Sequence, residues 1–210
     1  MKRTAEMERI TRETTIWIQL NLDGSGEVKL DYPVGFMAHM LRTFAAHGLF
    51  DIEVQATGDL EVDQHHLIED TGLVLGSCFA KALGEKRGIR RVGNCFFPMD
   101  ETLTRAVVDI SGRPYLFFSS SNPDIMSLPL ISAPVPGQGA AAFQADTVQD
   151  FWQGFVSTAG LTLHLDILRG RSAHHMIEAL FKAAARALRE ACEIDPNAPD
   201  TVPSIKGVLA

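Results

Sequence analysis

Cysteine is scarce in this sequence of 210 residues, which contains only Cys78, Cys95 and Cys192. Three widely spaced cysteines without a Cys-x-x-Cys pair argue against a disulfide framework and against a zinc site made of thiolates. A reducing compartment is the expected environment of such a chain. We therefore predict a cytoplasmic protein.

Long apolar runs and an excess of positive charge are also missing. No stretch approaches the ~18 apolar residues that a membrane-spanning helix needs, and the N-terminal segment MKRTAEMERI lacks the apolar region of a signal peptide. The 19 basic and 26 acidic residues give a formal net charge of −7. Because general nucleic-acid and membrane-surface binders rely on positive patches, we expect neither kind of partner.

What is present is an ordinary globular composition, with 46% hydrophobic and 21% charged residues. Alternating apolar residues predict strands over 15–22 and 27–30, which the turn residues 23–26 would join into a hairpin. The segment 119–144 is rich in Ser, Pro, Gly and Ala and is expected to be a long surface loop. Further strands are expected over 49–56, 92–97, 104–110, 115–119 and 161–168, and helices over 36–47, 65–83, 147–158 and 174–191.

The order of these elements repeats along the chain. A helix, a strand, a loop and a second helix occur over 36–83 and again over 147–191. The second helix opens with HHLIE at 65–69 in one copy and with HHMIE at 174–178 in the other. This internal duplication predicts one compact α+β unit of two β-β-α-β-α halves, 1–98 and 99–210, with sheet on one side and helices on the other.

Each copy of the His-His-x-x-Glu motif carries two side chains suited to binding one metal ion. Residues i and i+4 share a helix face, so His65 lies beside Glu69 and His174 lies beside Glu178. The second histidine of each copy points about 100° away and would serve another ion or a partner. A single copy would be explained by a solvated or capped helix start, but two copies in matching halves favour a dinuclear site. Imidazole and carboxylate ligands without thiolate suit Mn, Fe, Co or Zn better than Ca or Mg.

The remaining histidines and one aspartate have less specific surroundings. His39 and Asp150 stand 26 and 24 residues before the first histidine of the two motifs, so each is a candidate for one more ligand. The alternatives are a half-buried helix histidine and a helix-surface carboxylate. His47 lies near a helix end, where a favourable interaction with the helix C-terminus would explain it. We interpret His164, in an alternating strand, as structural.

Several polar residues are candidates for binding an anion. Arg91 ends a basic run, and Arg113 lies in a tight turn after a strand. Ser204 and Lys206 offer a hydroxyl and an ammonium group in a flexible segment, a plausible grip for a phosphate. Each of these features alone also fits a solvated turn or chain end. Glu13 is a further charged residue at a strand start.

Taken together, these segments resemble the imidazoleglycerol-phosphate dehydratase family of histidine biosynthesis, from about Thr4 to the C-terminus. The order and spacing of the segments and the duplicated motif are specific in combination. The matching segments are RET at 12–14, HML at 39–41, HGLFD at 47–51, GDL at 58–60, HHLIED at 65–70, RGIRR at 87–91, PMDE at 98–101, DISGRP at 109–114, TLH at 162–164, HHMIEA at 174–179 and SIKG at 204–207.

The resemblance implies a hydro-lyase that converts imidazole glycerol phosphate to imidazole acetol phosphate. It also implies two manganese ions per site, halves similar to ribosomal protein S5 domain 2, and a homo-oligomer of 24 subunits built from trimers, with sites shared between chains. The substrate proton is poorly acidic because no carbonyl adjoins its carbon. Metal ions on the imidazole and a substrate oxygen can stabilise an imidazolate, which then expels hydroxide.

The resemblance also assigns roles to individual residues. The metal ligands carry over onto His39, His65, His66, Glu69, His174, His175 and Glu178, and Asp150 is an additional candidate. The substrate contacts carry over onto Glu13, His47, Arg91, Arg113, Ser204 and Lys206. Glu13, Glu69 and Glu178 are the candidates for proton transfer.

Three positions depart from the family pattern. Ala38 replaces the usual Asp before the first ligand histidine, Asp150 replaces a histidine, and Ile205 replaces a small hydroxyl residue. These departures leave open a divergent paralogue that keeps the metal-linked assembly but has lost or altered the activity. A dinuclear metallohydrolase would also use two ions, but only the ligand set supports it.

Overall fold

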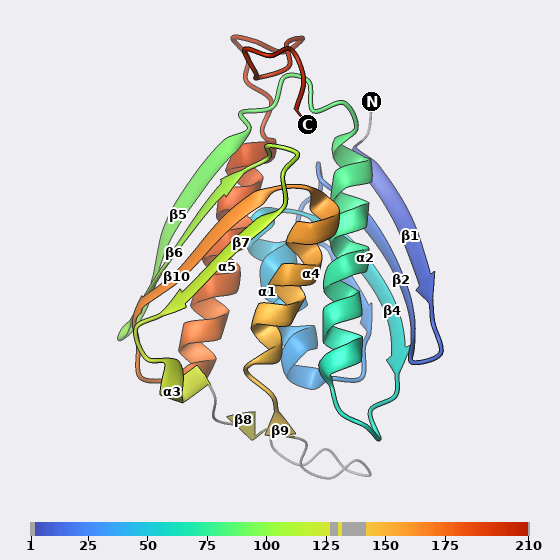
Figure 1. Cartoon of the computed structure of the whole chain (residues 1–210), viewed down its shortest axis with the longest axis vertical. Coiled ribbons are helices and arrows are strands. Elements are labelled where there is room, and N and C mark those ends of the chain that lie inside the picture. Colours follow the sequence, from blue (N-terminus) through green and yellow to red (C-terminus); the bar gives the residue numbers. More distant parts are fainter. Residues whose placement is uncertain (1–2, 127–129, 132–141, 210) are drawn as a thin grey trace.

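The computed structural model of the chain describes residues 3–126, 130–131 and 142–209. Two sheets of four strands form its outer layers, and four long helices lie between them (Figure 1). The first sheet contains β1 (Thr4–Ile10), β2 (Thr14–Asn21), β3 (Val28–Asp31) and β4 (Asp51–Gly58); the second contains β5 (Val92–Met99), β6 (Thr102–Asp109), β7 (Tyr115–Ser120) and β10 (Thr162–Arg169). The long helices are α1 (Gly35–Gly48), α2 (His65–Leu83), α4 (Thr147–Ala159) and α5 (Ala173–Cys192).

The two sheets have the same topology, which confirms the predicted α+β fold with duplicated halves. The strand orders are β1-β2-β4-β3 and β5-β6-β10-β7. In each sheet the third strand of the half runs parallel to the fourth, and the remaining pairs are antiparallel. All four predicted helices are present at nearly the predicted positions.

The predicted hairpin between 15–22 and 27–30 is wrong. β2 pairs with β1 and β4, while β3 pairs in parallel with β4. The Asp51 carboxylate accepts hydrogen bonds from the backbone N–H groups of Ser25 and Glu27, at 2.7 and 3.0 Å, and so directs the chain away from β2. The sequence pattern did not predict β1, because Ala5 is its one buried residue and charged side chains interrupt the alternation of apolar residues.

Two other expectations concern the middle of the chain. The predicted boundary between the two halves, after residue 98, lies within β5. The second sheet already begins at Val92, where β5 starts to pair with β6. Of the expected loop over 119–144, residues 127–129 and 132–141 lie outside the described residues. The described part holds the end of β7, a short helix α3 (Pro123–Met126) and a small antiparallel pair, β8 (Leu130–Ile131) with β9 (Ala142–Phe143).

The described part of the chain contains no helix that is long and apolar enough to cross a membrane. All three cysteines are free. Burial raises the pKa of Cys78 and of Cys192 to about 12, so both remain protonated thiols at neutral pH and are poor metal ligands.

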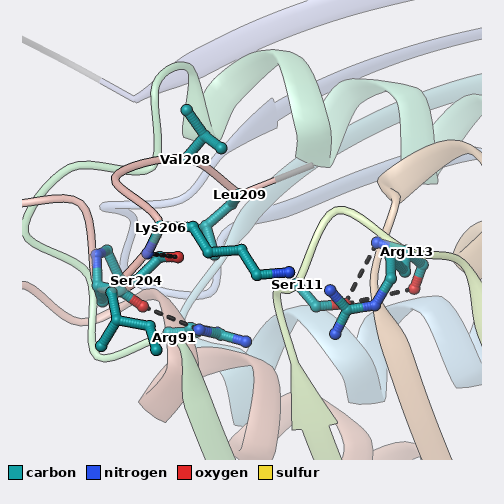
Figure 2. A pocket seen from close by; sticks show the side chains of 9 residues that line it. Arg91, Ser111, Arg113, Ser204, Lys206, Val208 and Leu209 are labelled. Atoms are coloured by element: carbon teal, nitrogen blue, oxygen red, sulfur yellow. Dashed lines mark hydrogen bonds between the residues drawn. The ribbon is translucent and has the colours of Figure 1, made fainter.

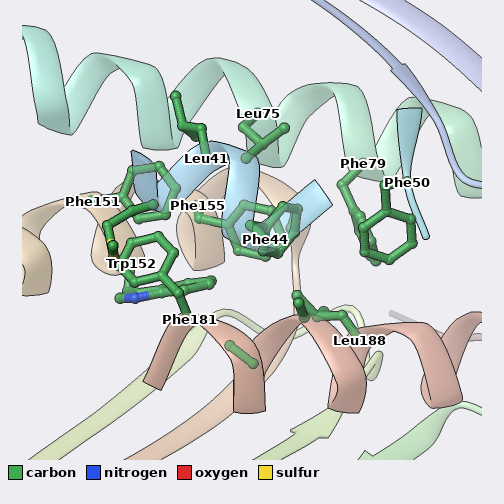
Figure 3. Close-up of a cluster of buried hydrophobic side chains, with 14 of the residues drawn as sticks. Leu41, Phe44, Phe50, Leu75, Phe79, Phe151, Trp152, Phe155, Phe181 and Leu188 are labelled. Atoms are coloured by element: carbon green, nitrogen blue, oxygen red, sulfur yellow. The ribbon is translucent and has the colours of Figure 1, made fainter. Parts of the chain in front are cut away.

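Aromatic side chains from the four long helices fill the space between the sheets (Figure 3). Phe44 from α1, Phe155 from α4 and Phe181 from α5 all lie in contact with Trp152, with ring centroids 4.9 to 6.1 Å apart. These rings are fully buried. Tight packing of these rings sets the angles at which the helices cross. The crossing angles in turn set the positions of the side chains at the helix starts.

Glycines set the close approach of α2 to α4. A Cβ atom added at Gly76 would lie 2.2 Å from the carbonyl oxygen of Phe155, and one at Gly72 would lie 2.1 Å from that of Phe151. Both obstacles are helix backbone, which cannot move aside as a flexible side chain would. We therefore expect Gly76→Ala to lower the free energy of unfolding by about 3 kcal/mol, the cost of forcing an extra methyl group into a packed core.

The midpoint of urea denaturation checks this expectation. Gly35→Ala is the matched control, because a Cβ atom there meets no described atom within 4 Å. The control should unfold at or slightly above the wild-type midpoint, since alanine favours a helix over glycine. Equal midpoints for the two variants would show that the helices can separate without cost.

Candidate active site

Three predicted ligands converge where α1 crosses α5. His39 Nε2 lies 3.4 Å and His174 Nε2 lies 3.0 Å from the same oxygen, Glu178 Oε2. One donor atom from each residue lies within 4.8 Å of the others. We call these three residues the first donor cluster. It combines α1 of the first half with α5 of the second, so it depends on how the halves pack together.

Glu178 is held as an ionised carboxylate although it is only 8% exposed. Burial alone would raise its pKa, but the hydrogen bond and charge of Lys182, together with His39, hold the pKa of Glu178 below its usual value. Lys182 Nζ lies 2.9 Å from Glu178 Oε1, which leaves Oε2 directed at the two histidines. Negative charge is therefore already present where a cation would bind.

The equivalent residues meet where α4 crosses α2, in a more open arrangement. His65 Nε2 lies 3.8 Å from Glu69 Oε2, and His65 Nδ1 lies 3.3 Å from Asp150 Oδ2. All three side chains are about 40% exposed. We call them the second donor cluster. Because its two carboxylates approach opposite nitrogens of one ring, its donor atoms converge less tightly than those of the first cluster.

The second histidine of each motif is turned away from the first, as the helical geometry predicts. The planes of His65 and His66 differ by 77°, and those of His174 and His175 differ by 88°. Neither His66 nor His175 shares a donor cluster with the histidine before it. Each instead contacts a carboxylate from a loop of its own half.

These two carboxylates are site residues that the sequence did not single out. Asp59 Oδ2 lies 3.0 Å from His66 Nδ1, and Glu101 Oε2 lies 3.0 Å from His175 Nδ1. The hydrogen bond to Asp59 raises the pKa of His66, and the bond to His175 lowers the pKa of Glu101 to about 2. Glu13 Oε2 is more distant, 3.9 Å from His66 Nδ1. Asp59 lies in the segment GDL and Glu101 lies in the segment PMDE, but no spacing rule connects either carboxylate with its histidine.

His47 lies in the last turn of α1, against the ring of Phe97 at 5.3 Å and an interplanar angle of 90°. Burial lowers the pKa of His47, and the nearby charges of Lys182 and Arg186 lower it further. A neutral imidazole gains little from the helix C-terminus, so the charge interaction suggested by the sequence is not favoured.

The four predicted anion-binding residues line one cavity of about 590 Å³ at the C-terminal tail (Figure 2). The side chains of Arg91, Arg113 and Lys206 extend towards the same space, and Ser204 lies beside them. Arg91 is fixed by a bidentate pair with Asp109, at 2.7 and 3.0 Å, and it donates to the carbonyl of Pro203 at 2.9 Å. This last bond ties the tail to the second sheet.

The C-terminal tail, which lines the cavity, and the starts of α2 and α5, which carry the donor clusters, lie at opposite ends of the molecule (Figure 1). The backbone N–H of Arg91 donates to the carbonyl of Ala191, in the last turn of α5. His174 is in the first turn of the same helix. At 1.5 Å per residue, these two turns are about 25 Å apart. A small substrate cannot contact both regions of one chain.

Three other residues noted in the sequence belong neither to the donor clusters nor to the predicted anion-binding set. His164 packs with the rings of Tyr115 and Phe117, with centroids 6.1 and 5.5 Å away. Ala38 is buried beside the first donor cluster, and the Ile205 side chain is fully exposed at the rim of the cavity.

Comparisons with known proteins show which family the chain belongs to. The sequence model of the imidazoleglycerol-phosphate dehydratase family matches residues 33–188. The imidazoleglycerol-phosphate dehydratase of Acinetobacter baumannii (strain AYE) is 49% identical over 208 residues, which cover 99% of this chain and 96% of the relative. That of Cupriavidus taiwanensis is 49% identical over 207 residues, 99% of this chain and 100% of the relative.

Solved structures of imidazoleglycerol-phosphate dehydratases are also similar to this chain. The imidazoleglycerol-phosphate dehydratase of Staphylococcus aureus has a TM-score of 0.74 at 35% identity, covering 91% of this chain and 99% of that chain. The Pyrococcus furiosus enzyme in complex with (S)-C348 has a TM-score of 0.75 at 31% identity, covering 97% and 100%. The chain therefore belongs to the imidazoleglycerol-phosphate dehydratase family.

Proposed function

We propose that this chain dehydrates imidazole glycerol phosphate to imidazole acetol phosphate in histidine biosynthesis, using two manganese(II) ions per site. The observation that carries the proposal is the matched pair of donor clusters at the starts of α2 and α5, in a chain of this family. Imidazole nitrogens and carboxylate oxygens without thiolate are the donor set expected for manganese or a similar transition metal.

The first donor cluster fits such an ion closely, with two imidazole nitrogens and one ionised carboxylate, and the second cluster fits it more loosely. When bound, the ions supply Lewis acidity that draws electron density from the substrate imidazole and makes its carbon-bound proton easier to remove. His39, His174 and Glu178 would hold one ion. His65, Glu69 and Asp150 would hold the other.

The separation between clusters and cavity supports a site shared between copies of the chain. Since about 25 Å of helix lies between them, the phosphate in the cavity of one copy must belong to a substrate whose imidazole is bound at the clusters of another. His66 and His175 point away from their own clusters and would complete those of neighbouring copies. We propose a homo-oligomer, in the family's 24-subunit form built from trimers.

Among the three candidate carboxylates, Glu13 is best placed to move a proton. Glu69 and Glu178 belong to the donor clusters, where their oxygens would face the ions. Glu13 belongs to neither cluster, and its side chain is about half exposed beside His66. A half-exposed carboxylate close to the imidazole site can accept the substrate proton and exchange it with solvent.

The cavity residues would fix the substrate by its phosphate. We expect Lys206→Met to raise KM for the phosphorylated substrate roughly 10- to 100-fold, since a charge-assisted hydrogen bond contributes about 1.5–3 kcal/mol. Lys29→Met is the matched control, because it removes an exposed ammonium group from β3 that pairs with Glu53 at the surface. Steady-state kinetics measure both, and an unchanged KM for Lys206→Met would remove this residue from the phosphate site.

Metal removal tests the function itself. Chelation should abolish turnover of imidazole glycerol phosphate, and added manganese should restore it, with the enolised product followed by ultraviolet absorbance. A metal-loaded, assembled protein without turnover would instead indicate the divergent paralogue, for which Asp150 in place of histidine is the main argument.

A further inference from the structure

Two carboxylates hold the outward-facing histidines in the same way. Asp59 Oδ2 and Glu101 Oε2 each lie 3.0 Å from the Nδ1 atom of the second histidine of their half. An ionised carboxylate can only accept a hydrogen bond, so Nδ1 of both His66 and His175 must carry the hydrogen. The lone pair of each ring is then on Nε2, the nitrogen that faces away from the carboxylate.

Glu101 is itself fixed at the start of α5. Its other oxygen, Oε1, accepts hydrogen bonds from the backbone N–H groups of Ser172 at 3.1 Å and Arg171 at 3.4 Å. One carboxylate therefore joins the turn between β5 and β6, the beginning of the helix and the ring of His175. The orientation of this ring follows from the fold of the second half.

Asp59 is fixed by the backbone on both sides. Its N–H donates to the carbonyl of Glu13 at 3.0 Å, and its carbonyl accepts from the N–H of Val62 at 2.8 Å. The Asp59 side chain is 17% exposed. Its Oδ1 atom is buried without a hydrogen-bond partner among the described residues, so His66 is the partner of this carboxylate there.

The two halves reach this geometry from different positions. Glu101 directly precedes β6, and the equivalent residue before β2 is Glu13. Glu13 Oε2 nevertheless lies 3.9 Å from His66 Nδ1, because Asp59, from the loop after β4, occupies the closer position at 3.0 Å. Because the two halves form the same contact with non-equivalent residues, the duplication alone does not explain this contact. Glu13 keeps only the longer contact with this histidine.

We propose that Asp59 and Glu101 are positioning residues: each holds the second histidine of its half with Nε2 free to bind a metal ion. This inference rests on the proposed metal-dependent function. A carboxylate on the far nitrogen of a ligating imidazole sets the tautomer and the orientation of its ring. Neither carboxylate touches the substrate or the ion in this arrangement.

The test is manganese(II) affinity, measured on the assembled full-length protein by the electron paramagnetic resonance of free manganese. Asp59→Ala and Glu101→Ala should each weaken binding roughly 10- to 100-fold. Asp59→Asn and Glu101→Gln keep an acceptor oxygen in the same place and should lose less. Glu61→Ala is the control, because it removes an exposed carboxylate from the same loop as Asp59 and should bind like the wild type.

The outcomes separate this inference from the proposed function. Wild-type protein that binds no manganese would overturn both. Wild-type binding with unchanged affinity in both alanine variants would overturn the positioning role alone. Affinity that falls equally in the alanine and amide variants would show that charge near the site, rather than orientation of the ring, sets the affinity, and would also overturn it. Circular dichroism and the elution volume confirm that each variant is folded and assembled.

Discussion

Glu178→Gln is expected to lower kcat/KM by about 10³-fold or more and to remove one of the two manganese ions. Glu178 supplies the one carboxylate of the first donor cluster, and its Oε2 atom contacts the Nε2 atoms of both histidines. Glutamine has nearly the same shape but no charge, and Lys182 would lose its anionic partner. A factor of 10³ corresponds to about 4 kcal/mol, within the several kcal/mol that a bound Lewis acid contributes.

Metal analysis and steady-state kinetics on the same samples check this result. Glu193→Gln, at the other end of α5, is the control, since its surface pair with Arg90 should contribute at most about 1 kcal/mol. A Glu178→Gln protein that retains two ions and full turnover would exclude this residue as a ligand.

Asp150→Ala is expected to weaken binding of the other ion roughly 100-fold or more, since even indirect partners of ligands change metal affinity 10- to 100-fold. Asp150 occupies on α4 the position that His39 occupies on α1, and its Oδ2 atom lies 3.3 Å from His65 Nδ1. Turnover should fall with occupancy of this ion. Asp150→His copies the first donor cluster into the second and should retain two ions.

A manganese titration separates the two ions, because the first donor cluster should fill before the looser second one. Gln149→Ala, an exposed neighbour on α4, is the control and should leave both affinities unchanged. Two ions bound with wild-type affinity by Asp150→Ala would show that Asp150 is a surface carboxylate, and the case for a divergent paralogue would strengthen.

The sequence was most informative where one helix contains the whole pattern. The pairing of His65 with Glu69, and of His174 with Glu178, follows from the i, i+4 geometry of a helix, and both pairs lie within 4 Å. The duplication also predicted that His39 and Asp150 would occupy related positions. It could not predict that each faces the motif of the opposite half, because that depends on how α1 crosses α5 and how α4 crosses α2.

Contacts between loops and strands were less predictable. Asp59 and Glu101 lie 7 and 74 residues before the histidines that they hold, so no local period connects them. The pairing of β3 with β4 depends on Asp51, which fixes the turn that the sequence assigned to a hairpin. The placement of the anion cavity at the opposite end from the clusters likewise requires the three-dimensional fold.

The most direct test of the central claim is anomalous diffraction at the manganese edge from crystals of the manganese-loaded protein. We expect two peaks per chain, one bounded by His39, His174 and Glu178 and the other bounded by His65, Glu69 and Asp150. Each peak should also be approached by the Nε2 atom of a second histidine from another copy. Peaks absent from both donor clusters would contradict the metal-dependent mechanism proposed for this chain.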